Sequence, residues 1–118
     1  MNQRKKILFI CTGNTCRSPM AEGLFLKLSA GHPEWLAGSA GKAVWNGQGA
    51  SPETLHVLRE HGVNLSGHAS RAVTQELVEE STDIYTMTES HLAVMLANFP
   101  EHADKIRLVT CYTDNRNI

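Results

Sequence analysis

The chain has 118 residues, of which 42% are hydrophobic and 19% are charged, and its formal net charge is −1. This length fits one domain with one hydrophobic core, and this composition is that of a globular protein, not a disordered one. The near-neutral charge excludes the basic surface of a nucleic-acid-binding protein, and no apolar run approaches the ~20 residues that a membrane span needs. No secretory signal peptide is visible, and three cysteines in such a chain indicate reduced thiols and a cytoplasmic location.

Four short segments are predicted as β-strands. The first, Lys6–Cys11, is a continuous apolar run without alternation, which is typical of a strand that is buried on both faces. Further strands are predicted at Trp35–Gly41, Asp83–Met87 and Ile106–Val109. The glycines of Trp35–Gly41 indicate a bend or the close approach of another backbone segment.

Helices are predicted between these strands, each beginning after a residue type that caps helix N-termini. The expected caps are Ser18 (before Pro19), Ser51 (before Pro52), Thr74 and Thr88. Apolar side chains recur at helical spacing after each cap, and a glycine or a proline ends the longer helices. These stop signals are Gly31 to Pro33, Gly62 and Pro100.

Strands that alternate with helices indicate a parallel sheet, because parallel neighbours need long crossover connections. The predicted fold is therefore α/β, a single Rossmann-like three-layer domain over residues 1–118 with a four-stranded parallel sheet and flanking helices. Ligands of such sheets bind beyond the carboxyl ends of the strands. This rule points to the loops that follow Ile10, Met87 and Val109.

The loop after the first strand has the composition of an anion-binding site. It reads Cys11-Thr12-Gly13-Asn14-Thr15-Cys16-Arg17-Ser18 and leads into a predicted helix. Backbone N–H groups of such a loop and the positive end of the helix dipole attract an anion, and Arg17 can bind a phosphoryl group through two hydrogen bonds. Cys11 would lie under that anion, where the same field favours a thiolate that can attack phosphorus. Ser18 could hydrogen-bond this thiolate, and Asn14 suits a left-handed position in the loop.

The stretch Cys11–Glu22 resembles the signature of the low-molecular-weight protein-tyrosine phosphatases, and most of all that of their protein-arginine-phosphatase branch. The resemblance continues through Ser39–Gly41, His68–Arg71 and Asp83–His91, so it extends over nearly the whole chain. It implies the phosphotyrosine protein phosphatase I-like fold and a metal-free hydrolysis of phosphate esters or phosphoramidates that needs no cofactor. The implied partners are phosphorylated protein substrates, and the sequence carries no sign of an oligomeric state.

The resemblance also implies roles for single residues of the loop. Cys11 would be the nucleophile that forms a phosphocysteine, and Arg17 would bind the phosphate. Thr15 would determine substrate preference, because tyrosine-specific relatives usually carry a larger aliphatic residue there and the arginine-phosphatase branch carries threonine. Cys16 would be a redox partner that forms a disulfide with Cys11 and protects it from irreversible oxidation. The rest of the phosphate-binding loop would be Thr12, Gly13, Asn14 and Ser18.

The family's general acid is an aspartate in an Asp-Pro motif on the loop after the fourth strand. Asp83 and Asp104 precede predicted strands and are expected at the opposite end of the sheet, so Asp114 is the only aspartate after the fourth strand. Asn115, not a proline, follows it. We therefore expect this chain to be truncated and to lack the acid loop and the C-terminal helix of the family.

Three alternatives to a phosphoarginine phosphatase stay open. A phosphotyrosine phosphatase would use the same fold and loop, and a non-catalytic phosphate-binding module would need no acid. A thiol-dependent arsenate reductase would need a resolving cysteine near the third strand, where residues 81–90 contain none, and Cys111 is a poor substitute. The six histidines show no His-x-His or His-x3-His pair, so no metal site is expected, and His68 and His91 are interpreted as structural.

Overall fold

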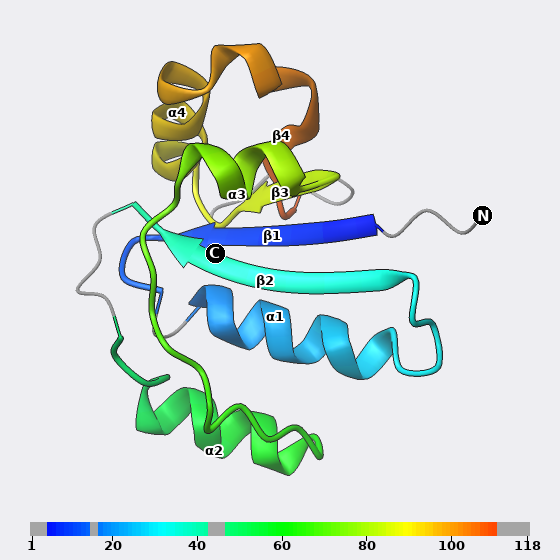
Figure 1. Cartoon of the computed structure of the whole chain (residues 1–118). Coiled ribbons are helices and arrows are strands. Elements are labelled where there is room, and N and C mark those ends of the chain that lie inside the picture. Colours follow the sequence, from blue (N-terminus) through cyan, green and yellow to red (C-terminus); the bar gives the residue numbers. More distant parts are fainter. Residues whose placement is uncertain (1–4, 15–16, 43–46, 111–118) are drawn as a thin grey trace.

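The computed structural model describes residues 5–14, 17–42 and 47–110. At its centre is a sheet of four strands: β1 (Lys5–Cys11), β2 (Trp35–Gly41), β3 (Asp83–Thr86) and β4 (Ile106–Leu108). The strands lie in the order β2-β1-β3-β4, and each neighbouring pair is parallel (Figure 1). Each strand boundary lies within one residue of its prediction, and the predicted α/β fold with a four-stranded parallel sheet is confirmed.

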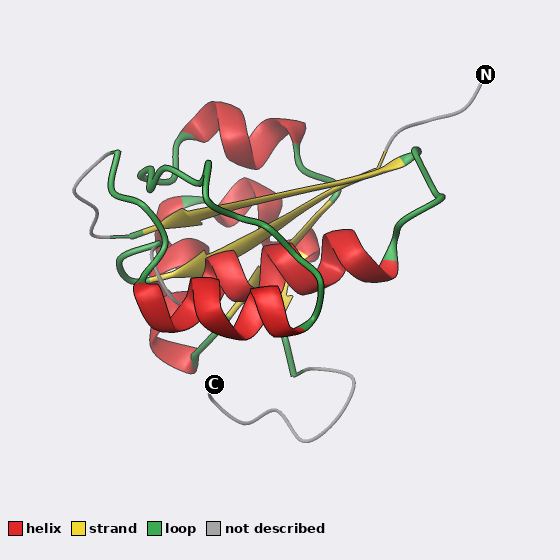
Figure 2. Ribbon diagram, turned by 90° about the horizontal axis from the view of Figure 1, so that it is seen from below, coloured by secondary structure: helices red, strands yellow, loops and turns green. Residues whose placement is uncertain are grey.

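Helices lie on both sides of the sheet, whose strands fan out with its twist in Figure 2. Helix α1 (Arg17–Leu28) packs on β1 and β2, and α2 (Pro52–Glu60) packs on the outer side of α1. Helices α3 (Gln75–Glu80) and α4 (Glu89–Asn98) cover the other face (Figure 1). Within the described ranges, no helix is long and apolar enough to cross a membrane.

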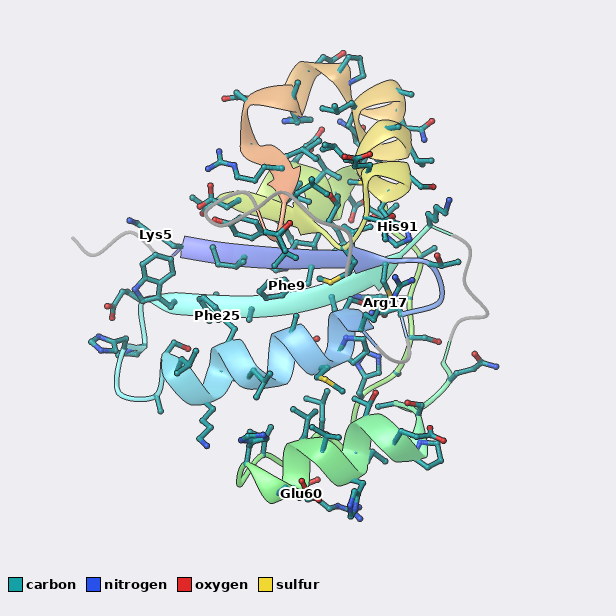
Figure 3. The ribbon with its side chains drawn as sticks, turned by 180° about the vertical axis from the view of Figure 1, so that it is seen from behind. Lys5, Phe9, Arg17, Phe25, Glu60 and His91 are labelled. Carbon is teal, nitrogen blue, oxygen red and sulfur yellow. The ribbon has the colours of Figure 1, made fainter. Side chains whose placement is uncertain are left out.

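The side chains of β1 fill the core on both faces of the sheet, as its unbroken apolar run predicts. Leu8 and Ile10 belong to the cluster under α3 and α4, together with Ile84 and Met95. Ile7 and Phe9 point the other way, and Phe9 packs on Phe25 of α1 with ring centroids 6.0 Å apart (Figure 3). Because successive side chains of a strand alternate between faces, β1 is the element on which both layers depend.

Three of the four predicted helix caps are confirmed. The hydroxyl oxygens of Ser51, Thr74 and Thr88 each accept a hydrogen bond from the backbone N–H three residues later. Gly62, with a φ of 77°, follows the end of α2 as the predicted stop signal. These caps satisfy N–H groups that a helix leaves without an internal partner.

The predicted cap of the first helix is wrong. Helix α1 begins at Arg17, so Ser18 is its second residue and Pro19 its third. The hydroxyl of Ser18 bonds inside the loop before the helix, to Cys11 and Asn14, and does not cap. Pro19 fits because the first N–H groups of a helix have no acceptor within it.

A second feature that the sequence reasoning misses is a 3-10 helix, η1 (Pro100–Lys105), between α4 and β4. Pro100 does end α4, whose C-cap is Phe99. The same proline occupies the first turn of η1, where its missing N–H is not needed. Pro100 thus ends α4 and begins η1.

Candidate active site

The three strand ends from which the predicted loops depart lie together at one edge of the sheet. Backbone hydrogen bonds join the strand ends there, from Met87 N to Ile10 O at 3.1 Å and from Val109 N to Thr86 O at 2.9 Å. On the other side of β1, Lys42 N donates to Cys11 O at 3.0 Å. These bonds fix the point from which the Cys11–Ser18 loop departs.

Cys11 is the last residue of β1, and its thiol lies at the base of this loop. It is 3% exposed. Its Sγ lies 2.9 Å from Ser18 Oγ and accepts a hydrogen bond from Asn14 N at 3.2 Å. Asn14 Nδ2 donates to Ser18 Oγ at 2.9 Å, which leaves the hydroxyl proton of Ser18 free to point at sulfur. The Asn14 N–H and the Ser18 hydroxyl thus both lie within hydrogen-bond distance of the Cys11 sulfur.

Asn14 shapes the loop from inside, as its predicted left-handed position implies. Its φ is 57° and it is completely buried. Its side-chain Oδ1 accepts from Arg71 N at 2.9 Å, and its backbone oxygen accepts from His68 Nε2 at 2.7 Å. The segment around His68 and Arg71 thus holds the loop from a position more than 50 residues later in the chain.

A second histidine reaches the loop from α4. His91 is 3% exposed, and its Nε2 lies 2.8 Å from Thr12 Oγ1. Burial lowers the pKa of His91, and the positive charges of Arg17 and Lys42 lower it further. Both His68 and His91 therefore contact the Cys11–Ser18 loop directly. In the sequence both histidines fall within the segments of resemblance and are interpreted as structural, so their contacts with the loop are missed.

Arg17 stands at the first position of α1, at the same end of the sheet as His91 (Figure 3). It borders an apolar cavity of about 200 Å³. The cavity's other lining residues come from α1 and from the ends of β3 and β4: Met20, Ala21, Leu24, Met87 and Val109. Cys11 belongs to the same buried cluster as Met87, against which Ala21 and Val109 pack, so Arg17 and Cys11 both adjoin this apolar wall.

Several predicted residues fall outside the described part of the chain. These are Thr15, Cys16, Cys111 and Asp114. Asp83 begins β3 and Asp104 lies in η1 just before β4, so both are at the amino end of the strands, opposite Cys11, as expected. Among the residues that the structure describes, no three His, Cys, Asp or Glu side chains are grouped so that they could hold a metal ion.

The buried thiol, the loop and the helix N-terminus on this sheet can be compared with known proteins. Residues 6–117 match the family described as low molecular weight phosphotyrosine protein phosphatase. The chain belongs to this family. Its members are cysteine-dependent protein phosphatases, so the protein is a hydrolase of this class, and the resemblance seen in the sequence is confirmed.

Relatives of two kinds share this family. The chain is 35% identical over 113 residues to low molecular weight protein-tyrosine-phosphatase Wzb of Salmonella typhi, covering 96% of this chain and 74% of Wzb. It is 37% identical over 103 residues to the protein-arginine-phosphatase of Bacillus subtilis, covering 85% and 67%. A solved structure of a YwlE arginine phosphatase, a cysteine-to-serine mutant with a phosphorylated active-site serine, matches with a TM-score of 0.87 and 32% identity, covering 96% of this chain and 74% of that one. Identity alone therefore does not separate the two substrate classes.

Proposed function

We propose that this phosphatase acts through a phosphocysteine on Cys11 and that its preferred substrates are proteins phosphorylated on arginine. The observation that carries the nucleophile is the buried Sγ of Cys11, held by Ser18 Oγ at 2.9 Å and Asn14 N at 3.2 Å. The structure of the YwlE mutant, with its phosphorylated active-site serine, supports a covalent step in a related protein.

The proposed reaction has two displacements at phosphorus. In the first, the Cys11 thiolate forms a P–S bond while the P–N bond of phosphoarginine breaks, and the departing guanidine nitrogen takes up a proton. In the second, water attacks phosphorus and loses a proton, the P–S bond breaks, and inorganic phosphate leaves with the thiolate restored. The Ser18 hydroxyl, donating to sulfur, stabilises that thiolate in both directions.

Arg17 and the loop amides are assigned to the phosphoryl oxygens. Arg17 begins α1, so its guanidinium and the positive end of the helix dipole act on the same anion. Their interaction strengthens as charge spreads over the equatorial oxygens in the transition state.

The preference for phosphoarginine rests on Thr15 and on the relatives named for arginine dephosphorylation. A specific observation favours phosphotyrosine as the second candidate. The apolar cavity beside Arg17, with Met20, Leu24 and Met87 in its wall, is the kind of surface on which an aromatic ring packs. The Wzb relative is named as a tyrosine phosphatase.

Single-turnover assays with matched phosphoarginine and phosphotyrosine peptides test both parts of the proposal. We expect a burst of phosphate transfer to the wild-type protein, faster with phosphoarginine, and no burst from Cys11→Ser, which should still bind inorganic phosphate. Thr15→Ile should shift the preference towards phosphotyrosine. Full turnover by Cys11→Ser would refute the nucleophile, and unchanged selectivity of Thr15→Ile would refute the role of Thr15. Phosphate binding without any wild-type burst would instead support the non-catalytic alternative.

A further inference from the structure

His91 belongs to α4, yet its side chain contacts the Cys11–Ser18 loop. It is the third residue of that helix, and its backbone N–H donates to the cap Thr88 Oγ1 at 3.1 Å. The residue is 3% exposed, and its Nε2 lies 2.8 Å from Oγ1 of Thr12, 79 residues earlier. Because the helix cap fixes the backbone of His91, its ring can hold Thr12 at a defined position.

The surroundings of the ring decide where its proton lies. Burial and the charges of Arg17 and Lys42 disfavour the imidazolium, so the neutral ring carries a single proton. Nδ1 is buried and has no hydrogen-bond partner among the described residues. A buried N–H without an acceptor is rarer in proteins than a buried acceptor without a donor. The proton is therefore placed on Nε2, where Thr12 Oγ1 receives it.

We propose that His91 is a positioning residue of the phosphatase site, which donates from Nε2–H to Thr12 Oγ1 and holds the residue next to Cys11 in a fixed orientation. This inference rests on the proposed function, because it assigns His91 a part in the same site. It goes further because it also makes the Thr12 hydroxyl a hydrogen-bond donor to the ligand. With its oxygen accepting from His91, the hydroxyl keeps its own proton for a ligand.

The exposure of the two neighbours fits that task. Thr12 is exposed at the mouth of the loop, whereas Cys11 beside it is buried. Because Thr12 directly follows Cys11, we assign its O–H to an oxygen of a phosphoryl group bound at Cys11. A donor held in place before binding costs less entropy when the ligand arrives than one that must first be ordered.

A second tether acts from the same side of the sheet. Lys42, just after β2, donates from its backbone N–H to Cys11 O at 3.0 Å, and its Nζ donates to Ser90 Oγ at 3.4 Å. Ser90 precedes His91 in α4. The first two residues of the loop are thus tied to the start of α4 by two routes, one through Lys42 and one through His91.

The tautomer is read directly by long-range ¹H–¹⁵N NMR of the full chain with ¹⁵N-labelled histidine. We expect the His91 nitrogens to show the neutral Nε2–H form at pH 7, with Nδ1 at the ¹⁵N chemical shift of an unprotonated ring nitrogen. This form should persist in the presence of inorganic phosphate. His91→Gln identifies the signals. An Nδ1–H tautomer or an imidazolium at pH 7 would overturn the proposal.

Affinity for inorganic phosphate, measured by calorimetry, tests the consequence. One hydrogen bond of this kind corresponds to about 2- to 10-fold in affinity, so His91→Leu and Thr12→Val should each weaken phosphate binding by that factor. His91→Gln, whose amide N–H can replace Nε2–H, should restore most of it. The double variant His91→Leu with Thr12→Val should bind no worse than Thr12→Val alone, because both changes remove one shared interaction.

Asn98→Leu is the matched control, because it also removes a polar side chain from α4, at the far end, where Asn98 Nδ2 donates to Val94 O at 2.9 Å. It should bind phosphate like the wild type. Additive losses in the double variant, or a glutamine variant as weak as the leucine variant, would show that His91 acts only as packing. If the wild type binds phosphate but never forms a phosphocysteine, the proposed function fails while these measurements still decide the role of His91.

Discussion

Asn14 is the residue whose replacement tests the geometry of the site most directly. Its side chain bridges Arg71 N and Ser18 Oγ, each at 2.9 Å, and its backbone sits at a φ of 57° in a completely buried position. Asn14→Ala removes both side-chain bonds and leaves a Cβ in the left-handed region. Asn14→Gly removes the same bonds but adopts that φ without strain. The two variants therefore separate the hydrogen bonds from the backbone conformation.

The expected magnitudes follow from these contacts. Each lost hydrogen bond costs about 0.5–1.5 kcal/mol of the free energy of unfolding, and alanine at positive φ costs a further 1–2 kcal/mol or so. Asn14→Ala should therefore lower the free energy of unfolding by about 3 kcal/mol. Glycine escapes the backbone strain but loses about 0.4–1 kcal/mol through the greater freedom of its unfolded chain. The glycine variant should thus be the more stable of the two by about 1 kcal/mol.

Urea unfolding followed by circular dichroism measures this difference, with Asn64→Ala as a control. Asn64 Oδ1 accepts from Ser66 N at 3.0 Å on the exposed surface, so its loss should cost less than about 1 kcal/mol. Single-turnover assays should show slower transfer to Cys11 in both Asn14 variants, because the Ser18 hydroxyl loses its orienting donor. Equal midpoints for alanine and glycine, or a more stable alanine variant, would refute the role given to the left-handed backbone.

Two further predictions concern packing and pH. In Gly23→Ala the new Cβ would lie 2.9 Å from Leu58 Cδ1 and 3.3 Å from Val63 Cγ1, so the buried Leu58 side chain must move. We expect the free energy of unfolding in urea to fall by about 1 kcal/mol, with turnover per folded molecule unchanged. In the folded protein the pKa of His91 lies below its ordinary value of about 6.5, so His91 binds a proton more tightly in the unfolded chain. The free energy of unfolding should therefore fall as the pH drops through about 6.5 towards that lower pKa. His91→Gln should show a shallower decline in urea midpoint between pH 7.5 and 5, and identical slopes would contradict the buried neutral ring.

The fold could be predicted because its signals are local. A single unbroken apolar run such as Ile7–Ile10 is long enough to be buried on two faces, and the alternation of such runs with capped helices leaves a parallel sheet as the outcome. The caps Ser51, Thr74 and Thr88 act over three residues, so each is legible in the sequence. The position of Cys11 and Arg17 follows from the same strand-loop-helix order.

The features that could not be predicted depend on competition between hydrogen-bond partners or on contacts between residues that are far apart in the sequence. Serine often caps a helix, but the hydroxyl of Ser18 forms hydrogen bonds with Cys11 and Asn14 in the loop instead. Helix propensities do not describe this competition between partners. The bonds from His68 to Asn14 and from His91 to Thr12 join residues 54 and 79 positions apart. Sequence spacing carries no signal for such contacts, so the two histidines showed only as part of a resemblance.

These distant contacts bear on the role that we propose for the Cys11–Ser18 loop as the active site. A loop of this length has no core of its own, and the left-handed conformation of Asn14 is only one of those open to a free peptide. The conformation persists because Arg71 and His68 bind Asn14, His91 binds Thr12, and Lys42 binds the backbone of Cys11. Donors that are already in place when a phosphoryl group arrives need no reorganisation in the transition state. The proposed reactivity of Cys11 therefore depends on residues in the segments after β2 and β3, and we expect a Cys-x5-Arg match in an unrelated chain that lacks these contacts to be insufficient for a phosphatase.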